Sequence, residues 1–535
     1  MSRKQTKYIF VTGGVLSGVG KGITAASLAN ILKSRGLKVN IQKCDPYLNT
    51  DAGTLNPTEH GEVFVTADGA ETDLDLGHYE RFLNQELDQS SSLMSGKILK
   101  QVIDDERSGK YLGKTVQIIP HVTDVIQDKI EAAGSGYDVH FVEIGGTVGD
   151  YEGLSFVEAI REFKSRVGRE NVLYVHVVYL PYIGASKEVK TKPAQNAVRT
   201  LRGYGISPDI LVARSEEPAG ESILNKLSMY TDIPLDGISI VPTLESVYEV
   251  PLHIGGLADF AMNKLKIKSR KRDGRAWREM VKTSLDTSLP RLKVGVVAKY
   301  LEHEDTYMSV FEALKAAAWG ENMQVDIVWI DSEEIEKKLP LETLESLDGI
   351  VVPGGFGSRG VEGKIAAASW AMENKLPYLG LCLGMQVAVI ALARENIDKS
   401  ANSVEFDPET KAPVISLMND QHEVVETGGT MRLGNWECHL AEDTRARKLY
   451  NAKVVSERHR HRYEFNNNYR KELTEAGMVI SGLSADGQLV ELIELENHPF
   501  FMASQFHPEF TSRPGAPNPL FKGFVQSIKS VQNNK

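Results

Sequence analysis

The sequence predicts an α/β protein with two doubly wound domains, and three observations indicate this class. Short apolar runs alternate with helical stretches in both halves of the chain. The apolar runs are nearly continuous, as is typical of strands buried on both faces of a parallel sheet. The chain has 535 residues, which is too long for one hydrophobic core. We therefore expect a domain over residues 1–265, a linker over 266–290 and a domain over 291–535.

In the N-terminal half, the first expected strand covers residues 8–12 and ends at Gly13-Gly14. A helix follows over 23–33, and Gly36 separates it from a second strand over 38–43. Further buried strands are expected at 139–144, 172–180 and 210–213.

The same pattern restarts near Arg291, after a basic and weakly patterned stretch. A helix is expected over 310–318. The expected strands cover 292–297, 325–330, 349–352 and 377–381, and a late hairpin combines 488–496 with 500–506.

Composition and charge exclude several classes of protein. A formal net charge of −11 disfavours a nucleic-acid partner, although a few lysines can still bind a small phosphorylated substrate. The basic run over 264–272 is interpreted as part of the linker. No apolar run approaches the roughly 20 residues that span a bilayer, and the polar residues 1–7 lead directly into a strand. We therefore expect a cytoplasmic protein with no membrane partner.

A glycine-rich loop over residues 13–22 lies between the first strand and the first helix. Backbone amides of such a loop, together with the helix N-terminus, bind phosphates, and Lys21 adds a positive charge. The loop departs from the standard phosphate motif. Five residues separate Gly14 from Gly20 instead of four, and Gly22 replaces the Ser or Thr that holds magnesium. The loop is therefore P-loop-like, and any Mg²⁺ needs carboxylate ligands from elsewhere in the chain.

Three carboxylates are candidates for that role: Asp73 and Asp75, and Glu143 at the end of an expected strand. From the residues alone, Asp73 and Asp75 cannot be ranked. A second basic segment contains Lys187, Lys190 and Lys192 and follows the strand that ends at residue 180. It suits contacts with a triphosphate and a base, or it is an exposed loop.

Cys382 is flanked by glycines two residues before and two residues after it, between an expected strand and helix. This spacing predicts a nucleophile elbow, in which the helix N-terminus favours the thiolate. His507 and Glu509 offer a base and the carboxylate that orients it. Gly354, after another strand, is the expected source of oxyanion amides. The other cysteines, Cys44 and Cys438, form no CxxC spacing, so a disulfide framework or a zinc site is not expected.

These motifs resemble known families. Residues 380–386 with 506–509 are similar to class I glutamine amidotransferases, whose Cys-His-Glu triad hydrolyses glutamine to ammonia, and this similarity covers roughly 291–535. Nearly the whole chain resembles the CTP synthase family, through the segments 10–14, 20–22, 71–81, 142–150, 188–193, 352–362 and 457–464. The resemblance implies an N-terminal amidoligase (synthase) domain and a C-terminal glutamine amidotransferase domain.

The resemblance also implies a reaction: ATP-dependent amination of UTP to CTP, with ammonia from L-glutamine or from solution, as a step of pyrimidine biosynthesis. It implies catalysis by Cys382, His507 and Glu509, and ATP contacts at Gly18, Val19, Gly20, Lys21, Gly22, Ile23, Lys43 and Asp75. It places Mg²⁺ on Asp75 and Glu143, which decides against Asp73. The implied glutamine contacts are Gly354, Leu383, Gly384, Met385, Gln386, Glu405 and Arg462. The implied UTP and CTP contacts are Ser17, Asp150, Tyr151, Glu152, Lys190, Thr191, Lys192, Pro193, Ala194, Gln195 and Lys226.

Regulation is also implied only by the resemblance: GTP as an allosteric activator, CTP as a feedback inhibitor, and a homotetramer. From position alone, the loop around Arg359 is hypothesised to be a GTP-responsive lid. Two alternatives remain at this point. One is another glutamine-dependent amidoligase that acts on a carboxylate, which would not need the lysine-rich segment. The other is a nucleotide-switched scaffold, which would have no use for Cys382, His507 and Glu509.

Overall fold

The computed structural model describes residues 5–268, 273–299, 304–337, 341–417 and 431–533. Its contacts divide the chain into two compact units, Met1–Asp51 with Asp75–Leu285, and Ala52–Leu74 with Asp286–Lys535. The segment Ala52–Leu74 therefore packs with the C-terminal half, although the predicted boundaries placed it in the first domain. Those boundaries stay a prediction. No helix in the described part of the chain is both long enough and apolar enough to cross a bilayer.

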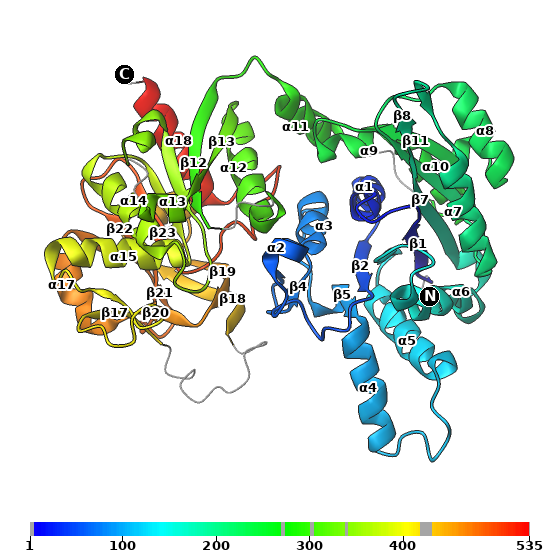
Figure 1. Ribbon diagram of the computed structural model, residues 1–535, viewed down its shortest axis with the longest axis horizontal. Coiled ribbons are helices and arrows are strands. Elements are labelled where there is room, and N and C mark those ends of the chain that lie inside the picture. The colour runs from blue at the N-terminus through cyan, green and yellow to red at the C-terminus, as the bar shows by residue number, and fades with distance from the viewer. Residues whose placement is uncertain (1–4, 269–272, 300–303, 338–340, 418–430, 534–535) are drawn as a thin grey trace. The chain divides into compact units, whose positions relative to one another are not determined.

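The first unit contains a seven-stranded sheet in which every neighbouring pair is parallel. Its strand order is β11-β10-β7-β1-β6-β2-β5 (Figure 1). The strands are β1 (Lys7–Gly13), β2 (Val39–Asp45), β5 (Ser92–Met94), β6 (Val139–Ile144), β7 (Val172–Leu180), β10 (Ile210–Ser215) and β11 (Ile238–Pro242). A small hairpin pairs β8 (Tyr182–Ile183) with β9 (Glu188–Val189).

Several helices of the first unit, α4 to α8 among them, bury apolar faces against this sheet. Phe10 on β1, for example, packs edge-on against Phe163 on α6 within one core cluster. The helices are α1 (Lys21–Ser34), α3 (Asp75–Leu83), α4 (Ser95–Arg107), α5 (Thr123–Gly134), α6 (Leu154–Val167), α7 (Lys192–Gly203), α8 (Glu221–Thr231), α9 (Val250–His253), α10 (Gly255–Lys264) and α11 (Arg275–Leu285).

Helix α11 lies inside the predicted linker. The indole of Trp277 packs against Phe82 and Tyr248 and donates a hydrogen bond to the carbonyl of Tyr248. Trp277 is half-buried, and Val281, one helical turn further on, is buried. These two apolar anchors, four residues apart, fix a helix in a stretch whose other residues are mostly polar. Residues 269–272 of the basic run lie outside the described part of the chain.

The second unit contains a nine-stranded mixed sheet with the order β13-β12-β14-β15-β23-β22-β21-β18-β19. Its first five strands are parallel, and the rest pair antiparallel. The strands are β12 (Arg291–Ala298), β13 (Gln324–Asp331), β14 (Gly349–Val352), β15 (Tyr378–Leu381), β18 (Arg432–Leu440), β19 (Val454–His461), β21 (Met478–Ser484), β22 (Val490–Leu495) and β23 (Phe501–Ser504). Two smaller sheets join β16 (Asn402–Ser403), β17 (Pro413–Leu417) and β20 (Tyr463–Phe465), and β3 (Phe64–Val65) with β4 (Glu71–Thr72).

Two core clusters hold helices of the second unit to its large sheet. One contains α14 and α15, and the other contains α12 and α18. The helices are α2 (Pro57–His60), α12 (Met308–Gly320), α13 (Ser332–Glu336), α14 (Val361–Glu373), α15 (Leu383–Asn396), α16 (Arg445–Tyr450), α17 (Arg470–Glu475) and α18 (Pro519–Asn533). The predicted α/β class is confirmed, and so is the predicted late hairpin, which is formed by β22 and β23.

Candidate functional site

The carboxyl ends of three neighbouring parallel strands meet at one edge of the large sheet in the second unit. Strand β15 lies between β14 and β23, with Leu381 in register with Ser504. The chain leaving β14 forms the Pro353–Gly357 loop, the chain leaving β15 reaches Cys382, and the chain leaving β23 reaches His507. Three distant parts of the sequence therefore deliver their side chains to one place.

The backbone at Cys382 adopts an unusual conformation, with φ 52° and ψ −100°, directly before α15. Such a conformation is costly for a residue with a side chain and persists only where its surroundings enforce it. The flanking glycines show why. A Cβ on Gly380 would lie 2.7 Å from the Gly384 backbone, and a Cβ on Gly384 would lie 2.0 Å from the Val352 carbonyl oxygen. The predicted elbow thus depends on both glycines.

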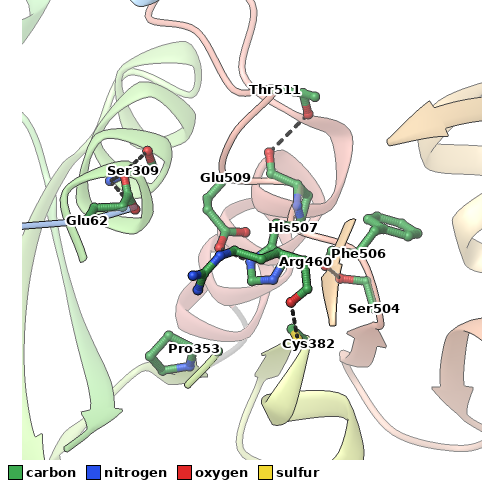
Figure 2. A network of polar contacts seen from close by, with 12 residues as sticks. Glu62, Ser309, Pro353, Cys382, Arg460, Ser504, Phe506, His507, Glu509 and Thr511 are labelled. Atoms are coloured by element: carbon green, nitrogen blue, oxygen red, sulfur yellow. Dashed lines mark hydrogen bonds and ion pairs between the residues drawn. The ribbon is translucent and has the colours of Figure 1, made fainter. Parts of the chain in front are cut away.

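The thiol of Cys382 is buried between two polar groups. The Gln505 side-chain amide donates to its Sγ at 3.6 Å, and the Arg460 carbonyl oxygen lies 3.8 Å from the same atom. Figure 2 shows this carbonyl directed at the sulfur. The N-terminus of α15, a fully helical segment of 14 residues, begins at the next residue. The positive end of the helix dipole therefore lies next to Cys382.

His507 and Glu509 form a buried pair in which His507 Nδ1 lies 2.8 Å from Glu509 Oε1. Burial by itself would lower the pKa of His507, but the Glu509 carboxylate and the Cys382 sulfur raise it to about 10. The His507 backbone N–H donates to the Arg458 carbonyl at 2.7 Å, and the Phe510 ring stacks on the imidazole. The His507 backbone is therefore held by one contact and its imidazole by two, and the imidazole is favoured in its protonated form.

The loop after β14 passes close to this pair. A Cβ on Gly354 would lie 3.0 Å from His507 Cε1 and 3.7 Å from the Cys382 Cβ, so the absence of a side chain lets the backbone approach. Beneath the loop, the fully buried Lys364 donates to the Pro353 carbonyl at 3.0 Å. Burial, and then the nearby Lys299, lower the pKa of Lys364 to about 7. The loop is well placed to offer backbone amides to an oxyanion.

A cavity of about 270 Å³ opens beside the thiol. Gly354, Cys382, His507 and Glu509 line it, and so do residues of the segment Ala52–Leu74. The cavity is lined by Gly53, Leu55, Glu62, Val63, Thr306, Tyr307, Val310, Pro353, Gly354, Gly355, Phe356, Cys382, Arg460, His507, Glu509 and Phe510.

The other residues expected to contact glutamine lie around this cavity rather than in its lining. Leu383, Gly384, Met385 and Gln386 form the first turn of α15, and the Gln386 amide donates to the Tyr463 carbonyl and to Gln505. Glu405 accepts the Gly357 N–H at 2.9 Å. Burial raises the pKa of Glu405, while Arg462 acts electrostatically to lower it. Glu405 and Arg462 therefore lie near each other at the far end of the Gly354 loop.

In the first unit, the glycine-rich loop joins β1 to α1 as predicted. Gly18 and Gly20 adopt left-handed backbone conformations, with φ 70° and 88°. A Cβ on Gly13 would lie 2.6 Å from Lys21 Cδ, so the lysine stem lies across the start of the loop. Val19, Gly22 and Ile23 complete the loop and the first turn of α1. This geometry suits phosphate binding by amides and by the Lys21 ammonium.

Asp75 and Glu143 approach the start of α1 from two directions. A Cβ on Gly22 would lie 2.6 Å from Asp75 Oδ1 and 3.2 Å from Glu143 Oε2. Lys43 forms an ion pair with Asp75, and the Tyr79 hydroxyl donates to Glu143. Burial by itself would raise the pKa of Asp75, but Lys43 holds it below its usual value, whereas burial and the neighbouring Asp75 raise the pKa of Glu143. These oxygen donors are of the kind that Mg²⁺ prefers.

A second cavity of the first unit, of about 550 Å³, is lined by lysines. It contains the predicted residues Lys190, Thr191, Lys192, Gln195 and Lys226. Pro193 and the buried Ala194 belong to the first turn of α7, beside this lining. Ser17 is exposed on the glycine-rich loop, and the cavity lining does not include it or Asp150, Tyr151 and Glu152, of which Tyr151 is 89% exposed. The structure thus brings together the lysine-rich part of the predicted nucleotide set.

Comparisons with known proteins agree with this geometry. Residues 7–267 match the family described as CTP synthase N-terminus, and residues 302–527 match Glutamine amidotransferase class-I. A CTP synthase from Herpetosiphon aurantiacus is 52% identical over 527 residues, covering 98% of each chain. One from Clostridium beijerinckii is 52% identical over 537 residues, covering 99% of each. The chain belongs to the CTP synthase family.

Among solved structures, the chain is similar to the Trypanosoma brucei CTPS glutaminase domain with bound acivicin. That similarity has 38% identity and a TM-score of 0.42, and it covers 45% of this chain and 94% of the other. The resemblance to CTP synthases stated from the sequence is confirmed over nearly the full length of the chain.

Several groups around the CTP synthase sites had not been assigned a role from the sequence. Gln505 and the carbonyls of Arg458 and Arg460 contact the triad, Lys364 supports the Gly354 loop, and Tyr79 holds Glu143. The only available signal was that Tyr79, Arg458 and Arg460 belong to motifs shared with the family. Backbone carbonyls carry no residue-specific signature, so their role emerges only from the fold.

Proposed function

We propose that Cys382, His507 and Glu509 release ammonia from glutamine, that the Lys21 loop binds ATP, and that the lysine-lined cavity binds UTP, which receives the ammonia. The protein is a CTP synthase, so the overall reaction converts UTP to CTP with nitrogen from glutamine. The single observation that carries the assignment of roles is the arrangement at Cys382. Its thiol lies at a strained strand-to-helix turn beside a buried imidazole–carboxylate pair.

In the glutaminase reaction, the Cys382 thiolate attacks the side-chain carbonyl carbon of glutamine. The amide groups of the Gly354 loop stabilise the oxyanion, and His507 gives its proton to the leaving nitrogen. Ammonia departs and leaves a thioester. Water then attacks the thioester with His507 as the base, and glutamate is released. Glu509 keeps His507 oriented and stabilises its protonated form.

In the nucleotide site, Gly18–Ile23 and Lys21 bind the phosphates of ATP, and Lys43 lies beside them. Asp75 and Glu143 would hold Mg²⁺, which when bound neutralises phosphate charge. ATP transfers its γ-phosphoryl group to the 4-oxygen of UTP, and ammonia displaces the resulting phosphate to form CTP. Lys190–Gln195 and Lys226 hold the UTP triphosphate, since their cavity combines several lysines with the Gln195 amide.

The regulatory features form a further part of the proposal. CTP binds as a feedback inhibitor through part of the UTP site, to which Ser17 also belongs, together with Asp150–Glu152. GTP activates through the loop around Arg359, whose guanidinium pairs with Glu333 at 2.9 Å and reaches the Lys299 carbonyl. The proposed assembly is a homotetramer, and the proposed location is the cytoplasm, where UTP, ATP and glutamine are available. Family membership removes the alternatives of a carboxylate-directed amidoligase and a scaffold.

Two variants test the division of labour, with CTP formation measured with glutamine or with ammonium as the nitrogen source. Cys382→Ala is expected to abolish glutamine-driven synthesis and to retain ammonia-driven synthesis. Lys21→Ala is expected to lose both. The assignment is refuted if Cys382→Ala fails with ammonia as well, or if Lys21→Ala keeps its ammonia-driven turnover.

A further inference from the structure

The segment Ala52–Leu74 is encoded in the N-terminal half but packs within the second unit. Its hairpin, β3 with β4, is connected to β18 by a backbone hydrogen bond from Asn435 N–H to the Ala67 carbonyl at 2.8 Å. Nearer its start, the buried Glu62 accepts hydrogen bonds from the backbone and side chain of Ser309 (Figure 2). Contacts at Glu62 and at the hairpin thus fix the segment to the rest of the second unit.

Strand β19 contacts this segment and the triad at the same residues. The Arg458 carbonyl accepts the His507 N–H, while its guanidinium donates to the Val65 carbonyl at 3.0 Å and lies over the Phe64 ring. The Arg460 carbonyl faces the Cys382 sulfur, while its Nε donates to Glu71 Oε1 at 2.8 Å. At each arginine, the backbone contacts the catalytic machinery and the side chain binds the hairpin.

A ring contact joins the hairpin to the triad by a second route. Phe64 on β3 packs edge-on against Phe510, with ring centroids 5.1 Å apart. Phe510 in turn stacks on the His507 imidazole, also at 5.1 Å. His507 therefore contacts a residue that packs on the hairpin, Phe510, and Cys382 contacts another that binds it, Arg460.

The ion pair between Glu71 and Arg460 is the polar centre of this arrangement. The Glu71 side chain is 2% exposed and that of Arg460 is 14% exposed. A buried ion pair that loses one partner leaves an uncompensated charge, so each residue holds the other in place. Gly53 packs directly against the pair, because a Cβ there would lie 2.1 Å from Glu71 Oε2. Arg460 also lies over the Phe356 ring, at 5.0 Å from its centroid, beside the Gly354 loop.

We propose that Glu71 is a positioning residue for glutamine hydrolysis. Through the ion pair, Glu71 holds Arg460 so that its carbonyl faces the thiol and its guanidinium forms part of the cavity wall. Leu74, the last residue of the segment, is followed directly by Asp75, a proposed Mg²⁺ ligand at the start of α3. A short stretch of chain therefore connects a wall of the glutaminase cavity to the phosphate site. The inference rests on the proposed role of Cys382.

The test compares Glu71→Ala, the near-isosteric Glu71→Gln, Arg460→Ala and the double variant Glu71→Ala/Arg460→Ala. Glutaminase kcat and KM, ammonia-driven CTP formation and the rate of Cys382 alkylation by iodoacetamide are measured for each. Arg291→Ala, which breaks the exposed ion pair with Asp326, is the control for loss of an ion pair elsewhere in the same unit. Ammonia-driven turnover reports whether the first unit of each variant folds, and thermal unfolding followed by circular dichroism reports whether the second unit does.

Glu71→Ala is expected to lower glutaminase kcat about tenfold or more, since small misplacement of reacting groups has effects of this size, and to slow alkylation. Glu71→Gln should lose less glutaminase activity than Glu71→Ala. Ammonia-driven synthesis should stay within about twofold of wild type in both of these variants. The double variant should be no worse than either single variant, because both remove the same interaction. Equal losses with both nitrogen sources, strictly additive losses or unchanged glutaminase activity would each overturn the inference. The role of the triad is tested by Cys382→Ala, whereas the role of Glu71 is tested by the variants above. A failure of one proposal can therefore be told apart from a failure of the other.

Discussion

Gly22 and Asp75 lie side by side: a Cβ on Gly22 would lie 2.6 Å from the carboxylate oxygen Oδ1 of Asp75. The standard phosphate loop has a hydroxyl residue at the position of Gly22, and that hydroxyl holds the metal. Here carboxylates of Asp75 and Glu143 approach the same point from other elements. The absence of a side chain at Gly22 therefore leaves room for a different set of oxygen ligands, the carboxylates of Asp75 and Glu143.

Restoring the hydroxyl residue of the standard motif should consequently impair the enzyme. Gly22→Ser is expected to lower CTP formation at least about tenfold with either nitrogen source, because its side chain would displace Asp75 and Glu143. Steady-state rates with saturating ammonium measure this effect. Gly256→Ala, at a helical glycine with open space around its Cβ position, is the matched control and should stay near wild type. A fully active Gly22→Ser enzyme would contradict the proposed ligand arrangement.

The nucleophile elbow should fail when Gly384 gains a methyl group. Gly384→Ala is expected to reduce glutaminase activity about a hundredfold, because the new Cβ would lie 2.0 Å from the Val352 carbonyl and would move the Cys382 turn. Ammonia-driven synthesis should remain, since the change is confined to the second unit. Gly515→Ala, in a loop of that unit with free space, serves as the control. Retained glutamine hydrolysis would mean that the turn tolerates the shift.

The pair of His507 and Glu509 predicts a specific pH dependence of stability. Because the pKa of His507 is raised to about 10, its protonated form stabilises the fold fully below the unfolded-state pKa of about 6.5. That stabilisation declines as the pH rises toward 10. The difference in free energy of unfolding between wild type and Glu509→Gln should therefore be largest near pH 6 and shrink by pH 9.5. Urea titrations at both pH values measure it; a difference that grows with pH would refute the charged pair.

Lys364 predicts the opposite trend. Its pKa is lowered to about 7, below the unfolded-state value of about 10.4, so between these limits the unfolded chain binds more protons. The stability of wild type relative to Lys364→Met should therefore rise with pH across this window, by at most about 1.4 kcal/mol per pH unit. Thermal unfolding at pH 7 and pH 9 compares the two. A flat difference would show that Lys364 stays charged in its site.

Local signals in the sequence were sufficient for most of the elements that carry the sites. The apolar run over 139–144 became β6 with the same bounds, and the run over 8–12 became β1 with one more residue at each end. The glycines around Cys382 predicted its turn because the steric demand is local. Helix α11 in the predicted linker could not be predicted in this way, since its apolar anchors are Trp277 and Val281 and the residues they pack against lie elsewhere in the sequence.

The contacts that could not be predicted are those between distant residues. Glu71 and Arg460 are separated by 389 positions, and nothing in the spacing of either residue indicates a buried partner. The carbonyls of Arg460 and Arg458, which contact Cys382 and His507, could not be predicted either, because every residue carries a carbonyl. Periodicity reports which face of an element is buried, but it does not report what covers that face.

The discontinuous second unit also constrains the order of events during synthesis. Val65 leaves the ribosome 393 residues before Arg458, the side chain that binds its carbonyl. At roughly 5–20 residues per second, this delay is about 20–80 seconds. Throughout that time Phe64 lacks Phe510, against which it is buried in the finished fold. The nascent N-terminal half therefore carries the apolar residues Phe64 and Val65 without the partners that later bury them, so this hairpin reaches its final packing only after the C-terminal half has been made.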